Sequence, residues 1–296
     1  MPRRTTGTAD GLLLVDKPVG VSSHDVVSVA RRALGESRIG HAGTLDPFAS
    51  GLLVLLVGRA TRLLPHLAGE PKVYEATIRF GAETDTEDHL GTVVREAPCP
   101  RRTALLEALP GLTGTIAQVP PAYSAKRIDG QRAYDRARRG EEVTLAPVTI
   151  QVHRWEVLRV DEGPLGVTEA PVRITCGGGT YVRSLARDLA RAVGSAAHLT
   201  ALRRLASGPF RVEEALSLDA LRAGPPDLRP ALAALPQHPV QLLEDDELER
   251  IVRGIDIAAT VEGPWAALTN GSNGALVALA ERRGDRWQPR VVMREV

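Results

Sequence analysis

The segment over residues 172–194 constrains this 296-residue chain more than any other. Residues 172–176 have the composition of a strand, the glycines at 177–179 predict a tight turn, and residues 180–193 have the spacing of an amphipathic helix that ends at Gly194. The chain therefore combines strands with helices. The glycine turn has neither the dinucleotide-binding spacing nor a P-loop lysine, so a nucleotide cofactor is not expected.

The N-terminal part predicts a second combination of strand and helix. Residues 11–16 are predicted to form a buried strand, after which Ser22 or Ser23 begins a helix that stops at Gly35. Residues 38–51 contain three glycines and a proline and are expected to form a loop before an apolar strand at 52–57. Catalytic and binding residues often lie in such loops.

Strict alternation over residues 72–80 predicts a strand with two different faces. Tyr74 falls on the apolar face, together with Ala76, Ile78 and Phe80. Further along, residues 131–139 are expected to form a basic helix that stops at Gly140.

Five prolines within residues 224–239 indicate a linker between domains. Beyond the linker, a short acidic helix over residues 245–253 and three strand-like stretches predict a small β-rich domain. We therefore expect a catalytic domain over residues 1–236 and an appended domain over residues 237–296.

No apolar run approaches the ~18 residues of a membrane span, and the first ten residues are not followed by an export signal. Cys99 and Cys176 lie far apart and outside any metal-ligand spacing, so neither a disulfide framework nor a metal site is predicted. Few cysteines are typical of a reducing compartment. We expect a cytoplasmic protein without a membrane segment.

The net charge is only +1, but the charges are unevenly distributed. Residues 123–139 contain six basic and two acidic side chains, and residues 181–204 contain five and one; residues 213–262 contain four basic and eleven acidic ones. The two basic segments could meet a phosphate backbone. The alternative is that they form ordinary solvated helix faces.

Two residues are candidates for chemistry before any family is considered. Asp46 lies on the loop sequence GHAGTLDP at residues 40–47, where Pro47 favours an extended conformation for it, although an Asp-Pro pair alone is an ordinary turn. Arg183 falls in the first turn of the helix after the glycines, where it could hold a carboxylate ionised. The alternative for Arg183 is a surface arginine.

The sequence lacks the motifs that several other classes of enzyme require. The His-x-Glu and paired-cysteine motifs of zinc deaminases are missing, and no serine or cysteine elbow accompanies His41 as a hydrolase would require. A glycosidase would ordinarily need two carboxylates.

Several segments together resemble the motifs of the TruB family of tRNA pseudouridine synthases. They are GLLLVDKP at residues 11–18, GHAGTLDP at 40–47, KVYEA at 72–76 and GTYVRS at 179–184. PPAYSAK at residues 120–126 and YDRAR at 134–138 are similar to the bacterial stand-alone branch. The resemblance spans roughly residues 11–210. It departs at Ala42, where the family usually has threonine. Residues after 239 resemble a PUA-type RNA-binding domain more weakly.

The resemblance implies an α+β pseudouridine synthase fold, with a mixed, mainly antiparallel sheet and flanking helices. It implies that uridine 55 in the T arm of tRNA is isomerised without metal or organic cofactor. By the same resemblance Asp46 is the central catalytic group, Arg183 pairs with it, and Tyr74 packs against the uracil.

Isomerisation breaks the N1–C1′ bond and joins C5 to C1′, so neither water nor a redox partner is needed. The target base must leave its stack, which costs a few kcal/mol, and His41 is the candidate for stacking on it. Tyr181, Lys126 and Arg127 are further candidates for RNA contact, with core packing as the alternative for Tyr181. Lys17 is either structural or phosphate-facing.

The leading hypothesis is a monomeric enzyme that acts on tRNA without an obligatory protein partner. A non-catalytic RNA-binding or RNA-folding protein is the second hypothesis, supported by the basic segments and the C-terminal domain. A guide-RNA-dependent subunit, which would need protein partners, is the third, and a glycoside hydrolase is the fourth.

Overall fold

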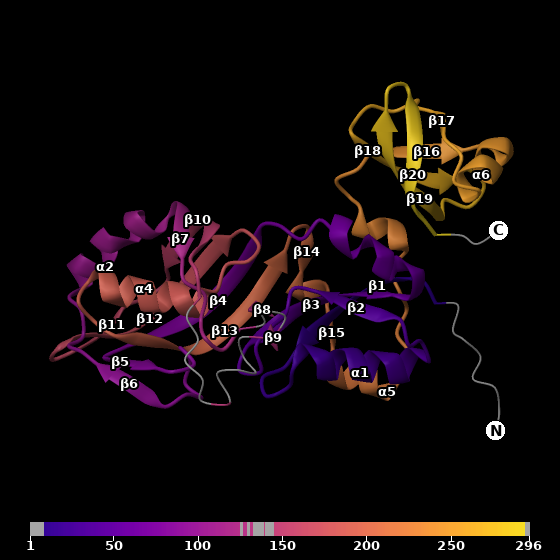
Figure 1. The fold of residues 1–296 in the computed structure, drawn as a ribbon. Helices are drawn as coiled ribbons and strands as arrows, with labels where there is room; N and C mark the ends of the chain where they lie inside the picture. Colours follow the sequence, from indigo (N-terminus) through magenta and orange to yellow (C-terminus); the bar gives the residue numbers. More distant parts are fainter. Residues whose placement is uncertain (1–8, 125–126, 129–130, 133–138, 140–144, 294–296) are drawn as a thin grey trace. The chain divides into compact units, whose positions relative to one another are not determined.

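The computed structural model describes residues 9–124, 127–128, 131–132, 139 and 145–293, with the backbone alone for residues 127, 128, 131 and 132. The chain falls into two compact units. The first consists of Met1–Pro47, Gly51–Gly69 and Pro209–Val296, and the second of Phe48–Ser50 and Glu70–Gly208. Figure 1 shows their helices and strands, coloured from indigo at the N-terminus to yellow at the C-terminus.

Strand β1 (Gly11–Lys17) organises the N-terminal part of the first unit. It pairs antiparallel with β3 (Ser50–Val57) and parallel with the short β15 (Leu216–Ser217). Strand β2 (Ile39–Ala42) pairs antiparallel with the second half of β3. All residues of β3 after its first are buried, as expected for a continuous apolar run.

Helix α1 (Ser23–Leu34) begins and ends where its capping residues predict. The hydroxyl of Ser22 accepts a hydrogen bond from the Asp25 backbone N–H, and the Asp25 carboxylate accepts one from the Ser22 N–H. Gly35 ends the helix with a φ of 63°, a conformation that glycine adopts without strain. Helix α5 (Leu218–Ala223) contacts α1 and is capped by the Ser217 hydroxyl.

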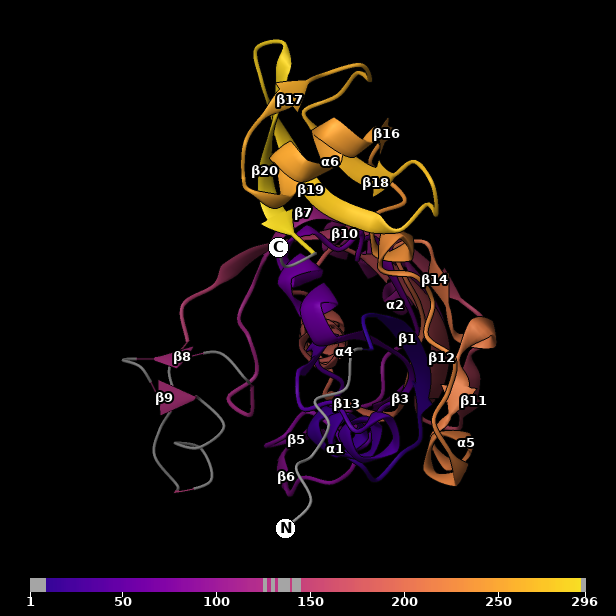
Figure 2. The same cartoon turned by 90° about the vertical axis from the view of Figure 1, so that its right-hand side faces the viewer.

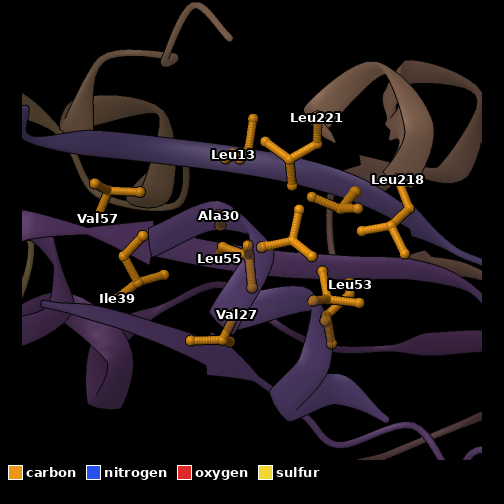
Figure 3. Close-up of a cluster of buried hydrophobic side chains, with 12 residues drawn as sticks. Leu13, Val27, Ala30, Ile39, Leu53, Leu55, Val57, Leu218 and Leu221 are labelled. Atoms are coloured by element: carbon orange, nitrogen blue, oxygen red, sulfur yellow. The ribbon is translucent and has the colours of Figure 1, made fainter. Parts of the chain in front are cut away.

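Helices α1 and α5 share one apolar core with strands β1, β2 and β3. Figure 3 shows side chains from β1 and β3 meeting those of α1 and α5. The labelled members include Leu13, Leu53 and Leu55 from the strands, Val27 and Ala30 from α1, and Leu218 and Leu221 from α5.

The C-terminal part of the first unit has its own sheet and its own core. The strand order is β16-β18-β19-β20-β17, and Figure 2 shows these strands together with helix α6 (Asp245–Val252). Ile251 of α6 packs into the same apolar cluster as the fully buried Trp287. The strands are β16 (Val240–Leu243), β17 (Ile257–Ala258), β18 (Trp265–Asn270), β19 (Leu276–Arg283) and β20 (Arg286–Val292). The remaining elements of the first unit are η1 (Gly58–His66), β14 (Phe210–Arg211), η3 (Val212–Glu214) and η4 (Ala231–Ala234).

The second unit is built on an antiparallel sheet in the order β13-β4-β12-β10-β7. These strands are β13 (Ala197–Ser207), β4 (Lys72–Phe80), β12 (Gly166–Cys176), β10 (Val148–Val157) and β7 (Gly114–Gln118), and β11 (Asp161–Gly163) pairs with β12. Helix α4 (Val182–Ala192) contacts β13 and β4. The smaller elements are the paired strands β5 (Ala82–Thr84) and β6 (Val93–Glu96), α2 (Arg102–Ala108), η2 (Leu109–Leu112), and the paired strands β8 (Arg127–Ile128) and β9 (Gln131–Arg132).

Most expectations from the sequence are confirmed. The alternating strand at residues 72–80 and the turn before α4 lie where predicted, and both units carry mainly antiparallel strands flanked by helices. The expected loop over residues 38–51 is wrong in part, because residues 39–42 pair with β3 as β2. Residues 131 and 132 form a strand instead of the start of a helix, and residues 133–138 lie outside the described part.

The domain boundary at residue 236 stays a prediction. Among the described residues, no helix has the length and apolar character that a membrane crossing requires.

Leu55 tests the shared core of the first unit, because its side chain is fully buried between the two helices and the strands. We expect Leu55→Ala to lower the free energy of unfolding by about 2–5 kcal/mol, from lost apolar burial and the cavity left behind. Urea denaturation followed by circular dichroism measures this loss. Leu165→Ala is the matched control. The Leu165 side chain is 87% exposed, so this substitution should change the free energy of unfolding by no more than about 0.5 kcal/mol. Equal losses in the two variants would contradict this description of the core.

Candidate active site

Asp46 is half-buried on the loop between β2 and β3, and both of its sequence neighbours are anchored. The Leu45 N–H donates to the Ser23 hydroxyl at 2.9 Å, and that hydroxyl donates to the Leu45 carbonyl at 3.1 Å. On the other side, the Pro47 carbonyl accepts a hydrogen bond from the Gly20 N–H at 2.8 Å. The backbone that carries the Asp46 carboxylate is therefore fixed from both sides.

Lys17 supports the turn that contains Gly20. Its side chain is fully buried, and its ammonium group donates to the carbonyls of Pro18 at 3.0 Å and Val21 at 2.7 Å. A buried ammonium group needs such acceptors, because an unpaired charge in the interior is costly. The arrangement favours the structural one of the two roles expected for Lys17.

His41 lies on β2 opposite Leu55 of β3, and its side chain is half-buried. It lies five positions before Asp46 along the chain, at the strand end of the segment that leads to the aspartate. Its expected role in stacking on a base stays a prediction.

Tyr74 lies on β4 with 7% of its surface exposed, on the same face as the buried Ala76, Ile78 and Phe80. Its position on the same strand face as Ala76, Ile78 and Phe80, expected from the alternation, is confirmed. In register it lies between Ile174 of β12 and Arg204 of β13.

Arg183 lies in the first turn of α4 and is 4% exposed, so its alternative interpretation as a surface arginine is wrong. One terminal nitrogen donates to the Thr86 carbonyl at 2.6 Å, and the other donates to the Tyr123 carbonyl at 2.9 Å. Two acceptors on the two terminal nitrogens fix the plane of the guanidinium group.

The start of α4 is held by a side-chain amide and not by an N-cap side chain. Gln118, fully buried at the end of β7, accepts from the Tyr181 N–H at 2.9 Å and donates to the Tyr181 carbonyl at 3.0 Å. Gln118 therefore pairs with Tyr181 as a neighbouring strand would. These contacts fix the residue two positions before Arg183.

The glycine turn before α4 binds a carboxylate. The Gly178 N–H donates to Glu70 at 2.7 Å, and a Cβ at position 178 would lie 2.2 Å from the same oxygen. A side chain at position 178 would therefore displace the Glu70 carboxylate from this backbone N–H. Lys72 follows nearby on β4; burial lowers the pKa of its ammonium group, while the charge of Glu70 opposes that shift.

Glu83 holds the far end of α4. It is 4% exposed on β5 and forms ion pairs with Arg95 of β6 and Arg191 of α4, each at 2.7 Å. Burial raises the pKa of this carboxyl, but the hydrogen bonds and charges of Arg191 and Arg95 outweigh burial and lower the pKa from 4.5 to about 2.

The basic segment over residues 181–204 carries most of its charge inside the unit. Arg183, Arg187 and Arg204 are 4%, 8% and 1% exposed. Burial favours internal roles for these three arginines over contact with phosphates.

The other candidates for RNA contact are only partly covered by the structure. Lys126 lies outside the described residues, and Arg127 is described by its backbone in β8 alone. Tyr181 is half-buried at the start of α4.

Within the described ranges, no group of three or more His, Cys, Asp or Glu side chains is arranged to hold a metal ion. The expected absence of a metal or organic cofactor stays a prediction.

The sequence did not identify three residues that hold this region in place. They are Ser23, Gln118 and Glu87, whose carboxylate accepts a hydrogen bond from the Ser184 hydroxyl of α4 at 2.8 Å. Ser23 was a candidate only as a helix cap, and that role belongs to Ser22. Gln118 and Glu87 have no local signal, because their partners on α4 lie 63 and 97 residues away.

Comparisons with known proteins agree with these motifs. The family model described as "TruB family pseudouridylate synthase (N terminal domain)" matches residues 31–182. The model described as "tRNA pseudouridylate synthase B C-terminal domain" matches residues 183–226.

Relatives match over nearly the whole chain. The tRNA pseudouridine synthase B of Thermobifida fusca (strain YX) is 46% identical over 290 residues, covering 96% of this chain and 98% of that protein. The protein of the same name from Nocardia farcinica (strain IFM 10152) is 44% identical, covering 99% of this chain and 96% of its own.

Solved structures agree in fold. A chain in "Crystal Structure of a Cbf5-Nop10-Gar1 Complex" superposes with a TM-score of 0.69 at 24% identity, covering 96% of this chain and 85% of that one. A chain in "Structure of H/ACA RNP bound to a substrate RNA containing 2'-deoxyuridine" gives 0.68 at 23%, with the same coverage. Together with the family models, these similarities confirm the expected pseudouridine synthase fold.

The Glu83 ion pairs predict a dependence of stability on pH. The folded-state pKa of about 2 lies below the ordinary value of 4.5, so the stabilisation is present above pH 4.5 and is lost as the pH falls toward 2. We expect Glu83→Gln to lower the free energy of unfolding at pH 7 by about 1–2 kcal/mol, allowing for solvent around the half-exposed guanidinium groups. The difference from wild type should shrink between pH 4.5 and pH 2.

Urea denaturation at pH 7, 5 and 3 measures this difference. Glu281→Gln is the control, since Glu281 pairs with Arg290 but is 37% exposed, and it should lose less stability than Glu83→Gln at pH 7. A difference between wild type and Glu83→Gln that stays constant down to pH 3 would contradict the depressed pKa.

Proposed function

The chain belongs to the TruB family and is a tRNA pseudouridine synthase, and we propose that it isomerises uridine 55 in the T arm with Asp46 as the central catalytic group. The anchoring of Leu45 and Pro47 around Asp46 is the observation that carries this assignment. A catalytic carboxylate needs a fixed position, because a displacement of ~1 Å can cost about 100-fold in rate. Backbone contacts on both sides of Asp46 supply that position.

The reaction needs little beyond one carboxylate. The N1–C1′ bond of the uridine breaks, the base turns over, and C5 bonds to C1′; the proton leaves C5, and N1 ends with a proton. Atoms and electrons balance without water, metal or redox partner. The proposal gives the Asp46 carboxylate the role of attacking or stabilising the intermediate, which a second carboxylate would otherwise share as in glycosidases.

Arg183 and Tyr74 complete the proposed catalytic set. A guanidinium group favours the ionised form of a carboxylate, and the proposal assigns that role to Arg183 toward Asp46. Tyr74 is assigned to packing against the uracil and to proton transfer. Asp46 belongs to the first unit and the other two to the second, and each is held by contacts inside its own unit.

RNA contact is proposed for four of the residues expected from the sequence. His41 would stack on the target base, and Tyr181, Lys126 and Arg127 would contact the T arm. For Lys17 we propose the structural role, since its ammonium group binds the carbonyls of Pro18 and Val21.

The C-terminal sheet is proposed to bind RNA as well, in line with its weak resemblance to PUA domains. Its described arginines are all paired with carboxylates: Arg250, Arg253, Arg282, Arg283, Arg286 and Arg290 lie 2.5 to 3.9 Å from acidic oxygens. Exposed ion pairs contribute little, roughly 0–1 kcal/mol each, so RNA phosphates could displace these carboxylates at small cost.

We further propose that the enzyme works as a monomer, in the cytoplasm, without an obligatory protein partner. The proteins named tRNA pseudouridine synthase B from Thermobifida fusca and Nocardia farcinica match over 96% and 99% of this chain. The solved structures of similar fold come from complexes, and their 23–24% identity shows the fold alone.

Asp46→Asn tests the catalytic assignment. Asparagine keeps the size of the side chain and removes its charge, so we expect release of tritium from C5-labelled uridine in an unmodified tRNA transcript to fall by at least about 1,000-fold. The dissociation constant for tRNA should stay within about threefold of wild type, because loss of one group that acts in the transition state leaves ground-state binding. Asp219→Asn, whose carboxylate is 89% exposed, is the control and should react like wild type.

The purified chain alone, without other proteins or guide RNA, is the required condition for this assay. Tritium release by Asp46→Asn at the wild-type rate would refute the role of Asp46. Binding of the transcript without any release by wild type would favour a guide-dependent or purely RNA-binding protein. A transcript with cytidine at tRNA position 55 should release no tritium if that position is the target.

A further inference from the structure

We propose that Glu87 is a positioning residue for the reaction: by binding Ser184 and Arg187 of α4, it fixes the Thr86 carbonyl that orients the Arg183 guanidinium group. The proposal rests on the proposed catalytic role of Arg183. All five residues belong to the second unit.

The position of Arg183 depends on loops. Its two carbonyl acceptors, at Thr86 and Tyr123, lie outside helices and strands. A guanidinium group held by loop carbonyls is only as well placed as the loops themselves. Each of the two loops therefore needs its own attachment to α4.

Glu87 attaches the first loop. It follows Thr86 directly and is 8% exposed. One carboxylate oxygen accepts from the Ser184 hydroxyl at 2.8 Å, and the other pairs with Arg187. Ser184 is the neighbour of Arg183, and Arg187 lies one helical turn further on. The carboxylate therefore binds α4 on the residues next to the arginine it is proposed to position.

The backbone of Glu87 is fixed on the opposite side by β13. Its N–H donates to the Thr84 carbonyl at 3.0 Å, and its carbonyl accepts from the Leu199 N–H at 3.1 Å. The His89 N–H returns a hydrogen bond to the Leu199 carbonyl at 2.9 Å. The loop that contains Thr86 and Glu87 is thus held by β13 through its backbone and by α4 through the Glu87 side chain.

Glu87 has a backbone φ of 61°, the only positive value among the described non-glycine residues. Such a conformation costs of order 1 kcal/mol or more and persists only where the surroundings impose it. Here the contacts to β13 and α4 impose it. Because Glu87 directly follows Thr86, the contacts that impose this conformation also fix the backbone at Thr86.

The second loop, which carries the Tyr123 carbonyl, is attached to α4 through Arg187, the same arginine that binds Glu87. Arg187 also donates to the Val119 carbonyl at 2.8 Å, and Gln118 binds both backbone groups of Tyr181. The Glu87–Arg187 pair therefore links the segment that carries Thr86 to the segment that leads to Tyr123.

Stability alone is a weak reason for this pair. Burial raises the pKa of the Glu87 carboxyl against the opposing effects of Arg187, Ser184 and Arg183. A buried ion pair is often no more stabilising than apolar side chains of the same volume. Its geometric role next to Arg183 is therefore the better explanation.

Glu87→Gln tests the proposal in the full-length protein. Glutamine keeps the size and can still accept from Ser184, but it loses the charge that ties Arg187 to this loop, while Arg187 keeps its ion pair with Asp188. We expect the single-turnover rate of tritium release at saturating protein to fall by about 10- to 100-fold, as for a small displacement of a catalytic group. The dissociation constant for tRNA should change less than about threefold.

Glu83→Gln is the matched control. Glu83 is also a buried glutamate paired with an α4 arginine, but that arginine, Arg191, lies two turns beyond Arg183. A loss of rate that comes only from weakening α4 would appear in both variants. We expect Glu83→Gln to react at the wild-type rate at pH 7.

The double variant Glu87→Gln with Arg187→Gln covers the case in which the single variant folds poorly. The double variant removes both charges of the Glu87–Arg187 pair, at the cost of the ion pair between Arg187 and the half-buried Asp188. The unfolding free energy should therefore recover in part relative to Glu87→Gln, while the rate stays low. Recovery of the rate together with stability would overturn the positioning role.

A wild-type rate for Glu87→Gln, or an equal loss in Glu83→Gln, would also overturn it. Arg183→Ala run in the same assay separates this failure from that of the proposed function. If Arg183→Ala is inactive and Glu87→Gln is fully active, only the role of Glu87 falls. If Arg183→Ala is fully active, the proposed role of Arg183 fails first, and the positioning proposal falls with it.

Discussion

Helix α4 carries an arginine every fourth residue along one face, and the need of these guanidinium groups for partners organises the second unit. Arg183, Arg187 and Arg191 bind, in order, the carbonyls of Thr86 and Tyr123, the carboxylate of Glu87, and the carboxylate of Glu83. An unpaired charge in the interior costs several kcal/mol, which applies to the buried Arg183 and Arg187 and to the buried Glu83 that binds the exposed Arg191. The loops that supply these acceptors therefore keep their positions relative to the helix.

The loop around Asp46 is held by a different kind of contact. Its anchors are hydrogen bonds between neutral groups, from Ser23 to both backbone groups of Leu45 and from Gly20 to Pro47. Each contributes only about 1 kcal/mol net, but together they restrict the backbone on both sides of the aspartate. Lys17 extends this support by closing the turn that contains Gly20. These contacts hold the loop through its backbone and through the side chains of Ser23 and Lys17.

These two arrangements suit an isomerase that requires a fixed carboxylate and a fixed cation. The family supplies the reaction, and the structure shows how this chain fixes the individual groups. Ser23 binds the backbone beside Asp46, Gln118 binds the backbone of Tyr181 at the start of α4, and Glu87 binds Ser184, the neighbour of Arg183. The basic segment over residues 181–204 also serves internal contacts, since three of its five arginines are buried.

The sequence by itself determined the elements that depend on neighbouring residues. Alternation placed Tyr74 on an apolar face, Ser22 and Gly35 marked the ends of α1, and the motifs around Asp46 and Arg183 identified the family. The partners of Ser23, Gln118 and Glu87 were decided only by the tertiary structure, since they lie 22, 63 and 97 residues away along the chain. Strand β2 was missed for the same reason, because its pairing with β3 and not its own pattern makes it a strand. Periodicity and capping are local properties of the chain, whereas a hydrogen bond between distant residues exists only once folding has brought them together.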